Sequence, residues 1–398
     1  MKQKRKLPQL YTKDEAYKII DSTETIIHRV KLQDIFNAHG NEYLTRNPSP
    51  PHVHKAVRAI QNCRTAALGA HVDACECGYT KISYNSCRNR HCPKCQALSK
   101  ERWLMARESE LLPVSYFHVV FTLPQELHEM ALHNREEIFS LLFKASAETL
   151  KALGKDPKHL GAELGFSSIL HTWGQNLMFH PYVHIIVPGG GLTTAGKWHS
   201  CGSKFFIPVK AMAKLFRGKF LGALKGMRHD LIGTDNYDDW QKLLNTLYSK
   251  DWYVYCKRPF KTSNSVLQYL ERYTHRIAIS NHRIIDIQDN KVSFLWRDYK
   301  DDNKQKVMTL TADEFIRRFL LHILPPKFTK IRHYGFLASF VKTKKLGLCR
   351  ELLNIAPQVA AIIISTVELI EKLTGVDITV CPKCGLSLSR ASPYGVTA

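Results

Sequence analysis

The pattern of hydrophobic and polar residues predicts both strands and helices, in an irregular order along the chain. Residues 117–123 form a β-branched and aromatic run that Pro124 closes, and 183–187 form a second apolar run, so both are expected to be strands. Apolar residues recur at helical spacing over 134–153. Further elements are expected as helices over 209–227, 237–249 and 264–276 and as a short strand pair within 282–296. This irregular alternation favours an α+β fold over a doubly wound sheet.

Changes in composition divide the chain into three regions. Residues 1–108 are basic and rich in loops, with a breaker cluster at 47–51 ahead of a cysteine-rich stretch. The predicted α+β core follows over 109–326. Residues 327–398 begin with seven lysines and arginines and no acidic residue up to Arg350. We therefore expect an N-terminal module, a central domain and a basic, helical C-terminal region.

The charge of the chain narrows the class of partner. The sequence holds 57 Lys and Arg against 35 Asp and Glu, a formal net charge of +22, and its 44% hydrophobic residues suffice for a core. Such an excess favours a polyanion, most often nucleic acid, over a merely soluble basic protein. No apolar run reaches the 18 residues of a membrane span, and 359–364 is expected to be a buried helix. Without an apolar segment after its charged start, the chain is expected to be cytoplasmic, with no membrane partner.

Cysteine spacing predicts a structural zinc site. Six of the eleven cysteines fall between 63 and 95, and this clustering of an odd number argues against a disulfide framework. Two short pairs separated by fourteen residues resemble the paired knuckles that hold zinc in a tetrahedron. The expected ligands are Cys75, Cys77, Cys92 and Cys95, with Cys63, Cys87 and His91 as alternates. The competing interpretation is a set of buried free thiols.

Two further features accompany the knuckles. Cys381 and Cys384 form half of a zinc ribbon whose remaining ligands are not evident from the sequence, so a second zinc is only weakly indicated. Arg88, Arg90 and Lys94 lie around the second knuckle. They are candidates for contacts with backbone phosphates, although a solvated basic face is an equal alternative.

One predicted strand carries a possible catalytic metal site. His180, Tyr182 and His184 share a face, because side chains alternate along a strand. Two imidazoles can hold a divalent ion, but they are also common as structural residues. Because His180 and His184 lie about 13 Å apart along a regular strand, sharing one ion would require a bulge at Pro181. His184 is therefore the more firmly expected ligand. The glycines at 189–191 would suit either a phosphate approach or a flexible turn.

The predicted helix 264–276 carries two tyrosines on one face. Tyr269 and Tyr273 are four residues apart, among several arginines and histidines. A phenol, with a pKa of about 10, is a poor nucleophile alone, but beside a metal-bound phosphate it can attack phosphorus. The competing interpretation is a half-buried aromatic stripe.

Taken together, these residues resemble a known family, the two-tyrosine HUH transposases of rolling-circle insertion sequences (the IS91 type), with their N-terminal transposase zinc-binding domain. The resemblance covers nearly the whole chain. It is carried by the segments 84–96, 118–124, 180–191, 269–280 and 331–336.

The resemblance implies a fold and a reaction. The central domain would be an HUH-type antiparallel sheet with packed helices, and the histidine strand would hold Mg²⁺ or Mn²⁺. One tyrosine would cut single-stranded DNA at an end of the protein's own mobile element, leaving a 5′-phosphotyrosine, and the other would serve the paired cleavage or strand transfer. No nucleotide cofactor is needed, because the protein–DNA ester keeps the energy of the broken bond. The candidate DNA-binding residues also include Arg272, Arg276, Lys330 and Arg332.

One position departs from the family pattern. Tyr182 stands where the family strand usually has a histidine, so His180 would replace it, with Gln175 as a third ligand. A catalytically impaired, zinc-dependent DNA-binding relative is therefore an alternative. A relaxase or replication initiator would use the same chemistry without transposing. An RNA-binding zinc protein would fit the charge but would leave the paired tyrosines unexplained.

Overall fold

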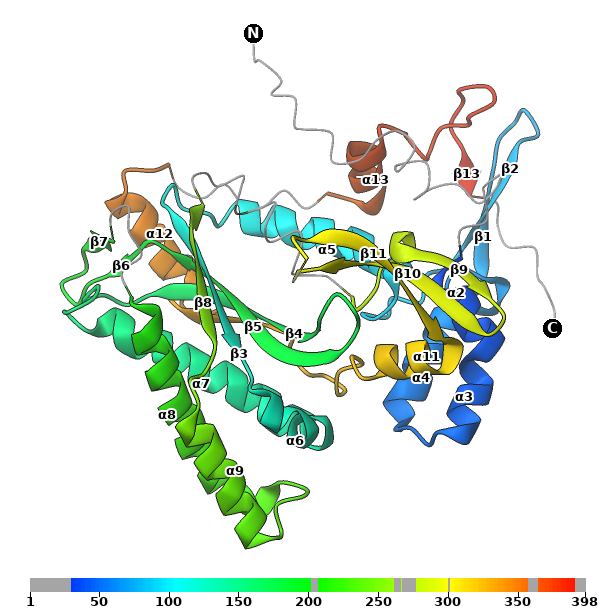
Figure 1. Cartoon of the computed structure of the whole chain (residues 1–398). Coiled ribbons are helices and arrows are strands. Elements are labelled where there is room, and N and C mark those ends of the chain that lie inside the picture. Colours follow the sequence, from blue (N-terminus) through cyan, green and yellow to red (C-terminus); the bar gives the residue numbers. More distant parts are fainter. Residues whose placement is uncertain are drawn as a thin grey trace.

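The computed structural model describes residues 30–201, 207–260, 266, 277–299, 301–356 and 364–390. Its centre is a five-stranded sheet in which every neighbouring pair is antiparallel (Figure 1). In spatial order the strands are β12 (Ile331–Gly335), β4 (Gly165–Trp173), β5 (Phe179–Pro188), β3 (Tyr116–Thr122) and β8 (Val254–Phe260). The predicted α+β class and the strands at 117–123 and 183–187 are confirmed.

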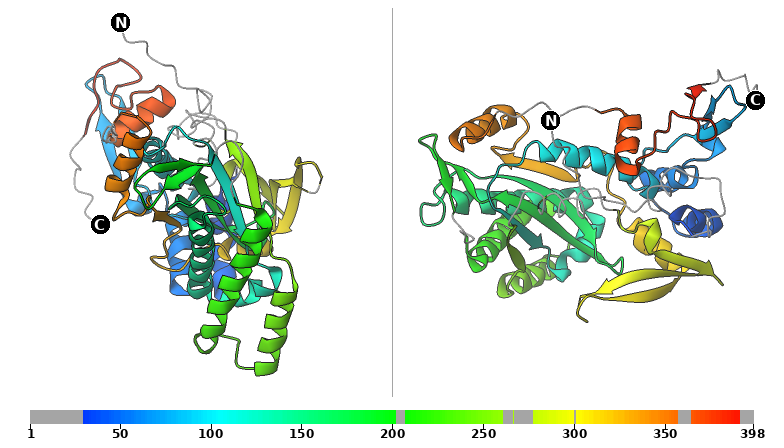
Figure 2. Two further views of the ribbon diagram at one scale, coloured as in Figure 1. Left: turned by 90° about the vertical axis from the view of Figure 1, so that its left-hand side faces the viewer. Right: turned by 90° about the horizontal axis from the view of Figure 1, so that it is seen from above.

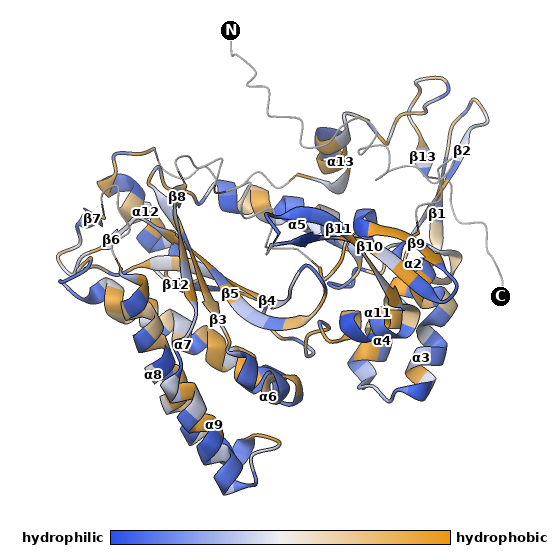
Figure 3. Cartoon of the chain, viewed as in Figure 1, coloured by the Kyte–Doolittle hydropathy of each residue, from blue (hydrophilic) through white to orange (hydrophobic). Residues whose placement is uncertain are grey.

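Helices cover one face of this sheet and form the main hydrophobic core with it. They are α6 (His128–His133), α7 (Arg135–Lys155), α8 (Val209–Gly226) and α9 (Tyr237–Ser249). On β3, Val119 and Phe121 point into this core, where the Phe121 ring meets that of Phe216 on α8 at 4.9 Å. Figure 3 shows the contrast between the hydrophobic strand β3 and the largely hydrophilic outer surface of α9. The helices predicted at 134–153, 209–227 and 237–249 are confirmed.

The opposite face of the sheet is crossed by α5 (Pro93–Glu108). Trp103 and Leu104 of this helix pack against a small cluster that includes Ile169 and Ile186. At its far end, a guanidinium nitrogen of Arg107 lies 3.3 Å from Nε2 of His333 on β12. The helix therefore covers part of this face and begins at Cys92, in the cysteine-rich stretch.

A second core joins regions that are far apart in the sequence. The N-terminal helices α2 (Leu32–Ile35), α3 (Asn41–Arg46) and α4 (Pro51–Gln61), with a π-helical turn at Phe36–Gly40, pack against α11 (Ala312–Leu320) and a three-stranded sheet. The strands of that sheet are β9 (Ile284–Gln288), β10 (Lys291–Asp298) and β11 (Lys304–Thr311). The rings of Phe36 and Phe319 meet edge to face at 5.4 Å. This core thus combines residues from the first and second of the regions expected from composition.

The remaining elements lie around these two cores. The hairpin of β1 (Ala70–Ala74) and β2 (Thr80–Tyr84) gains the C-terminal strand β13 (Ser389–Arg390). Two views show α12 (Lys342–Leu352) apart from α13 (Thr366–Thr374), which lies near that hairpin (Figure 2). The glycine run enters β6 (Gly190–Leu192), which pairs with β7 (Trp198–Ser200). Single 3-10 turns lie at Ala66–Leu68, Gln125–Leu127, Arg228–Asp230 and Asn281–Arg283.

Two predicted helices fall largely beyond this description. Of the expected helix 264–276, only residue 266 belongs to the described residues, and of the apolar run 359–364 only residue 364 does. Among the helices that the structure describes, none is long and apolar enough to cross a membrane.

Candidate functional sites

Three histidines meet on the sheet face that α5 crosses, and we call them the histidine cluster. His118 on β3, His171 on β4 and His184 on β5 are all buried. Nε2 of His118 lies 2.8 Å from Nδ1 of His184, and the His171 ring lies 4.7 Å from the His184 ring, edge to face. Strand register explains the meeting, because Val120 lies opposite His184 and Ile186 lies opposite His118.

The donor atoms of this cluster suit a divalent cation. Two ring nitrogens at 2.8 Å are close enough either to share a proton or to bind one ion together, since metal–imidazole bonds are about 2.0–2.1 Å long. Neutral imidazoles are common ligands for such ions. A site with two or three imidazole ligands leaves coordination positions for a substrate oxygen, as a catalytic metal site requires.

The expected partners of His184 lie elsewhere. The ring of His180 lies 5.5 Å from that of His128, and the residue is exposed. The amide of Gln175 donates to the Tyr299 hydroxyl at 3.1 Å. The structure thus brings His184 next to two histidines that the sequence analysis did not name as ligands. The alternation of side chains along 117–123 and along 165–173 was the sequence signal for His118 and His171. The strand register that aligns these two residues with His184 is not visible in one sequence.

Tyr182, at the position where a histidine was expected, lies beside the cluster. Its ring is 4.9 Å from that of His184 and 5.6 Å from that of His171. Its hydroxyl donates to the backbone carbonyl of Trp173 at 3.2 Å. That hydrogen bond fixes the phenol against the strand β4, so Tyr182 forms an aromatic wall of the histidine cluster.

The predicted nucleophiles Tyr269 and Tyr273 lie outside the described residues, as do the candidate DNA-binding residues Arg272 and Arg276. Val266, just ahead of them, is described and fully buried. It belongs to one small hydrophobic cluster with Tyr116, Ile169 and Ile186.

The place of Val266 bears on the predicted tyrosines. Ile169 lies opposite His184 in the register, and Ile186 lies opposite His118. Val266 therefore packs on the face that holds the histidine cluster, against the residues next to it. Val266 is the described residue nearest in sequence to Tyr269.

The first of two cysteine clusters lies in the second hydrophobic core. Sγ atoms of its four residues all lie within 4.8 Å of one another, with the Cys87–Cys95 pair at 3.5 Å and the Cys63–Cys95 pair at 3.6 Å. A tetrahedron of thiolates around zinc, with bonds of about 2.3 Å, has edges of about 3.8 Å. We call this set the core cysteine cluster: Cys63, Cys87, Cys92 and Cys95.

The second set, which we call the terminal cysteine cluster, consists of Cys75, Cys77, Cys381 and Cys384. The expected grouping of Cys75 and Cys77 with Cys92 and Cys95 is therefore wrong, because these two pairs belong to different clusters. The physical reason is the hairpin β1–β2, which carries the first pair away from the second. The end of α4 meanwhile brings Cys63 to Cys92. The C-terminal half ribbon completes the first pair.

His91, an alternate ligand in the sequence analysis, belongs to neither cluster. Burial, reinforced by the charges of Arg90 and Lys330, lowers the pKa of His91 to about 3. The imidazole is therefore neutral in the folded protein near neutral pH. It borders the core cysteine cluster through the adjoining Cys92.

Two basic residues near the second knuckle form internal contacts. The guanidinium of Arg90 donates to the carbonyls of Phe328 and Pro325, each at 2.6 Å, and burial lowers its pKa. The ammonium of Lys94 donates to the side-chain oxygen of Gln33, and burial lowers the pKa of Lys94 as well. These contacts tie the knuckle to the rest of the chain.

The other candidate DNA contacts differ in placement. Arg88 is exposed. Lys330 lies 5.0 Å above the ring of Trp173, which stacks on His171 at 4.9 Å. Arg332 lies on the opposite side of the sheet, 4.4 Å above the ring of Phe143 on α7. Of these three, Lys330 is the one beside the histidine cluster.

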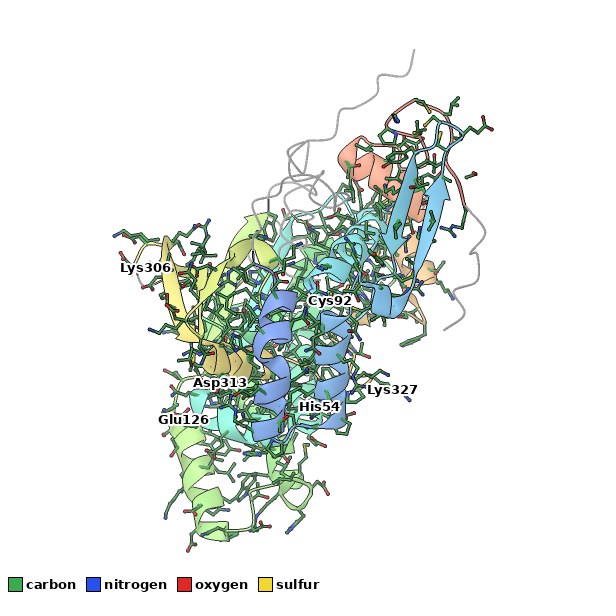
Figure 4. The ribbon with its side chains drawn as sticks, turned by 90° about the vertical axis from the view of Figure 1, so that its right-hand side faces the viewer. His54, Cys92, Glu126, Lys306, Asp313 and Lys327 are labelled. Atoms are coloured by element: carbon green, nitrogen blue, oxygen red, sulfur yellow. The ribbon has the colours of Figure 1, made fainter. Side chains whose placement is uncertain are left out.

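A shallow depression of about 780 Å³ adjoins the core cysteine cluster. Among its lining residues are His54, Lys55, Arg58 and, at its inner side, Cys87. Figure 4 shows Cys92 within the packed interior, while Lys306 and Lys327 lie at the periphery. Most of its exposed lining is apolar, and Lys55 and Arg58 are its cations next to the metal-binding part of the chain.

Comparisons with known proteins give this arrangement a context. Residues 35–123 match the family model described as "Transposase zinc-binding domain", and residues 165–345 match that described as "Putative transposase". The chain is 45% identical to "Putative transposase y4qJ" of Sinorhizobium fredii over 89% of this chain and 92% of that protein. It is 28% identical to "Transposase for insertion sequence element IS801" of Pseudomonas savastanoi pv. phaseolicola, over 76% and 74%. No solved structure matches.

Proposed function

Because this chain belongs to the IS91 family of insertion-sequence transposases, with its N-terminal zinc-binding domain, we propose that it cuts and rejoins single-stranded DNA at the ends of its own element. Tyr269 and Tyr273 are the nucleophiles of this reaction, and each forms a 5′-phosphotyrosine. The observation that carries the proposal is the histidine cluster, on the face against which Val266 packs just before the tyrosines.

The reaction needs a phosphoryl group held between the histidines and a tyrosine. The phenolic oxygen attacks phosphorus, the bond from phosphorus to the 3′ oxygen breaks, and the 3′ oxygen takes a proton to become a free hydroxyl. A bound Mg²⁺ or Mn²⁺ would stabilise the charge on the phosphoryl oxygens. His184 and His118 would hold the ion. His171, whose ring lies against that of His184, is the third imidazole next to it. His180 and Gln175 have no part in this version of the site.

The position of His118 bears on the substitution at 182. His118 comes from the neighbouring strand and places a ring nitrogen 2.8 Å from His184. In our proposal it takes the place of the histidine that the family strand usually carries where Tyr182 stands. Tyr182, with its hydroxyl on the carbonyl of Trp173, packs against the ligands.

The path of the DNA would follow cationic side chains. Lys330, half-exposed above the buried ring of Trp173, is the candidate cation nearest to the histidine cluster. Its ammonium would neutralise a phosphate of the strand. The depression lined by Lys55 and Arg58 would receive DNA beside the zinc-binding domain. There, zinc at the core cysteine cluster would have a structural role.

A denaturing-gel assay for covalent protein–DNA adducts tests the proposal. Labelled single strands from the ends of the element are mixed with the protein and Mg²⁺ or Mn²⁺. The wild type should give an adduct of the combined mass, the double variant Tyr269→Phe/Tyr273→Phe should give none, and His184→Ala should give none. His180→Ala is the matched control and should retain the adduct. An adduct that survives in the double variant would contradict the assignment of the nucleophiles.

A non-catalytic DNA-binding role is the second candidate, and the tyrosine at position 182 is the observation that favours it. In that case the wild type binds the same strands tightly and contains zinc, yet forms no adduct with either ion. A relaxase or replication initiator would form the adduct but would yield no strand-transfer products with a target DNA. The same assay, extended with a target strand, separates these outcomes.

A further inference from the structure

We propose that the terminal cysteine cluster binds a second zinc ion and that this ion fastens the C-terminal segment of the chain to the N-terminal hairpin. The four ligands are Cys75 and Cys77 from the hairpin and Cys381 and Cys384 from the C-terminal segment. The matching family models end at residues 123 and 345, so neither contains the complete site. The inference does not depend on the proposed cleavage reaction.

The geometry of the sulfur atoms supports a tetrahedral thiolate site. Sγ of Cys75 lies 3.4 Å from Sγ of Cys384, and Sγ of Cys77 lies 3.6 Å from Sγ of Cys381. All four atoms lie within 4.8 Å of one another. Zinc bound to four thiolates requires edges of about 3.8 Å and leaves no open position. The site is therefore structural and not catalytic.

Each ligand pair is closed by a hydrogen-bonded turn that ends in a left-handed glycine. Gly78 follows Cys77 with a φ of +82°, and Gly385 follows Cys384 with a φ of +78°. The N–H of Gly78 donates to the carbonyl of Cys75, three residues earlier, and the N–H of Gly385 donates to that of Cys381, four residues earlier, both at 2.9 Å. A left-handed residue at this point favours glycine. Two segments more than 300 residues apart thus each present two sulfurs from a tight, glycine-ended turn, although the two turns differ in length by one residue.

The described residues around the cluster bury little apolar surface. Within residues 70–84 and 376–390, the buried side chains are those of Cys75 and Cys381 alone. The backbone contribution is a two-residue strand, in which Asp73 lies opposite Arg390 and Ala74 opposite Ser389. A unit this small cannot fold on buried apolar area, and natural domains of this size use disulfides or a metal. The four cysteines supply the metal ligands.

The proposed ion also positions a helix over the body of the protein. The segment that ends in Cys381 and Cys384 begins with α13, and the guanidinium of Arg102 on α5 donates to the hydroxyl of Thr366 on α13 at 2.5 Å. Figure 1 and the right-hand view of Figure 2 place α13 near the β1–β2 hairpin and apart from α12. Since α5 continues across the histidine face, the second zinc holds the C-terminal segment near the helix that links the core cysteine cluster to that face.

The first test is the metal content of the full-length protein, purified in reductant and measured by plasma mass spectrometry. The wild type should carry two zinc ions per chain and Cys381→Ser/Cys384→Ser one. Cys201→Ser, which changes a cysteine outside both clusters, is the control and should carry two. One ion in the wild type, or two in the double variant, would overturn the proposal. So would two disulfides found by mass spectrometry in protein kept under reductant.

A second test needs no cysteine substitution in the decisive sample. A site-specific protease sequence inserted directly after the exposed Ala356 allows the folded, zinc-loaded chain to be cut between α12 and α13. The fragment that contains Cys381 and Cys384 should remain with the rest of the protein on size-exclusion chromatography. The same fragment with both cysteines changed to serine should separate. Separation of the wild-type fragment under zinc-replete conditions would contradict the fastening role.

Discussion

The core cysteine cluster and the histidine cluster are joined by one helix but differ in what they can do. Four thiolates converge in the first and fill every position of a tetrahedral ion. Two or three imidazoles meet in the second, on a sheet face that also receives Val266. A saturated set of soft ligands stabilises a fold, whereas an unsaturated set of nitrogens leaves room for a phosphate. In our proposal the cysteines therefore have a structural role and the histidines a catalytic one.

The largest effect is expected from breaking the core cysteine cluster. Cys92 is buried in a core shared with α11 and β10. Cys92→Ser therefore removes a zinc ligand and, with it, the ion that would hold the elements of that core together. Structural zinc contributes about 10 kcal/mol or more to the folding of small domains. We expect zinc content to fall by one ion and the cooperative thermal transition of this core to disappear, as measured by calorimetry. An unchanged transition with the zinc lost would show that the hydrophobic core suffices.

The histidine cluster should show the opposite behaviour. His184→Ala is expected to lower the rate of adduct formation by about 10³-fold, because loss of a metal-bound transition state costs several kcal/mol and each 1.36 kcal/mol is tenfold. The zinc content should stay at the wild-type value, and the cavity left by the buried imidazole should lower the melting temperature without removing the cooperative transition. His180→Ala, on the same strand, is the control with near-normal rates. An equal loss of the adduct-formation rate in His184→Ala and His180→Ala would contradict the different roles given to these two histidines.

A third prediction separates a structural histidine from those of the cluster. Buried His322 interacts with Thr172 through Nδ1 and with the carbonyl of Leu177 through Nε2. Desolvation lowers its pKa from 6.5 to about 4, with a smaller effect from Arg135. As pH falls, the unfolded state therefore binds this proton at a higher pH than the folded state does. The contribution of His322 to the free energy of unfolding is fully present above pH 6.5 and is lost toward pH 4, by up to about 3 kcal/mol. His322→Asn should flatten this part of a urea-denaturation profile, and an unchanged slope would contradict the assignment.

The smallest effect is expected at Tyr182. Tyr182→Phe removes one hydrogen bond to the Trp173 carbonyl, worth about 1 kcal/mol, and should leave the adduct rate within about threefold. Tyr182→His would add an imidazole beside His184 and should lower the Mn²⁺ concentration needed for half-maximal cleavage. A complete loss of activity in Tyr182→Phe would show that the hydroxyl takes part in the reaction.

The sequence predicted individual helices and strands but not the contacts between segments far apart in the chain. Periodicity located β3, β5, α7, α8 and α9 to within a few residues, because each is set by its own hydrophobic pattern. The pairing of Cys75 and Cys77 with Cys92 and Cys95 failed, because proximity in sequence hid the hairpin between them. The sequence analysis recognised Cys381 and Cys384 as half of a zinc ribbon, but a local pattern does not identify partners more than 300 residues away. Likewise His118 reaches His184 through strand register, which a single sequence does not specify.

The central claim is our proposal that Tyr269 or Tyr273 becomes linked to DNA in a reaction that depends on the histidine cluster. The most direct test is to form the adduct with wild-type protein, digest the DNA and the protein, and locate the residual nucleotide by tandem mass spectrometry. The account predicts a phosphodiester mass on Tyr269 or Tyr273, the residues that follow Val266. A nucleotide on any other residue, or no modified peptide from protein that binds the strands and contains its zinc, would contradict the account.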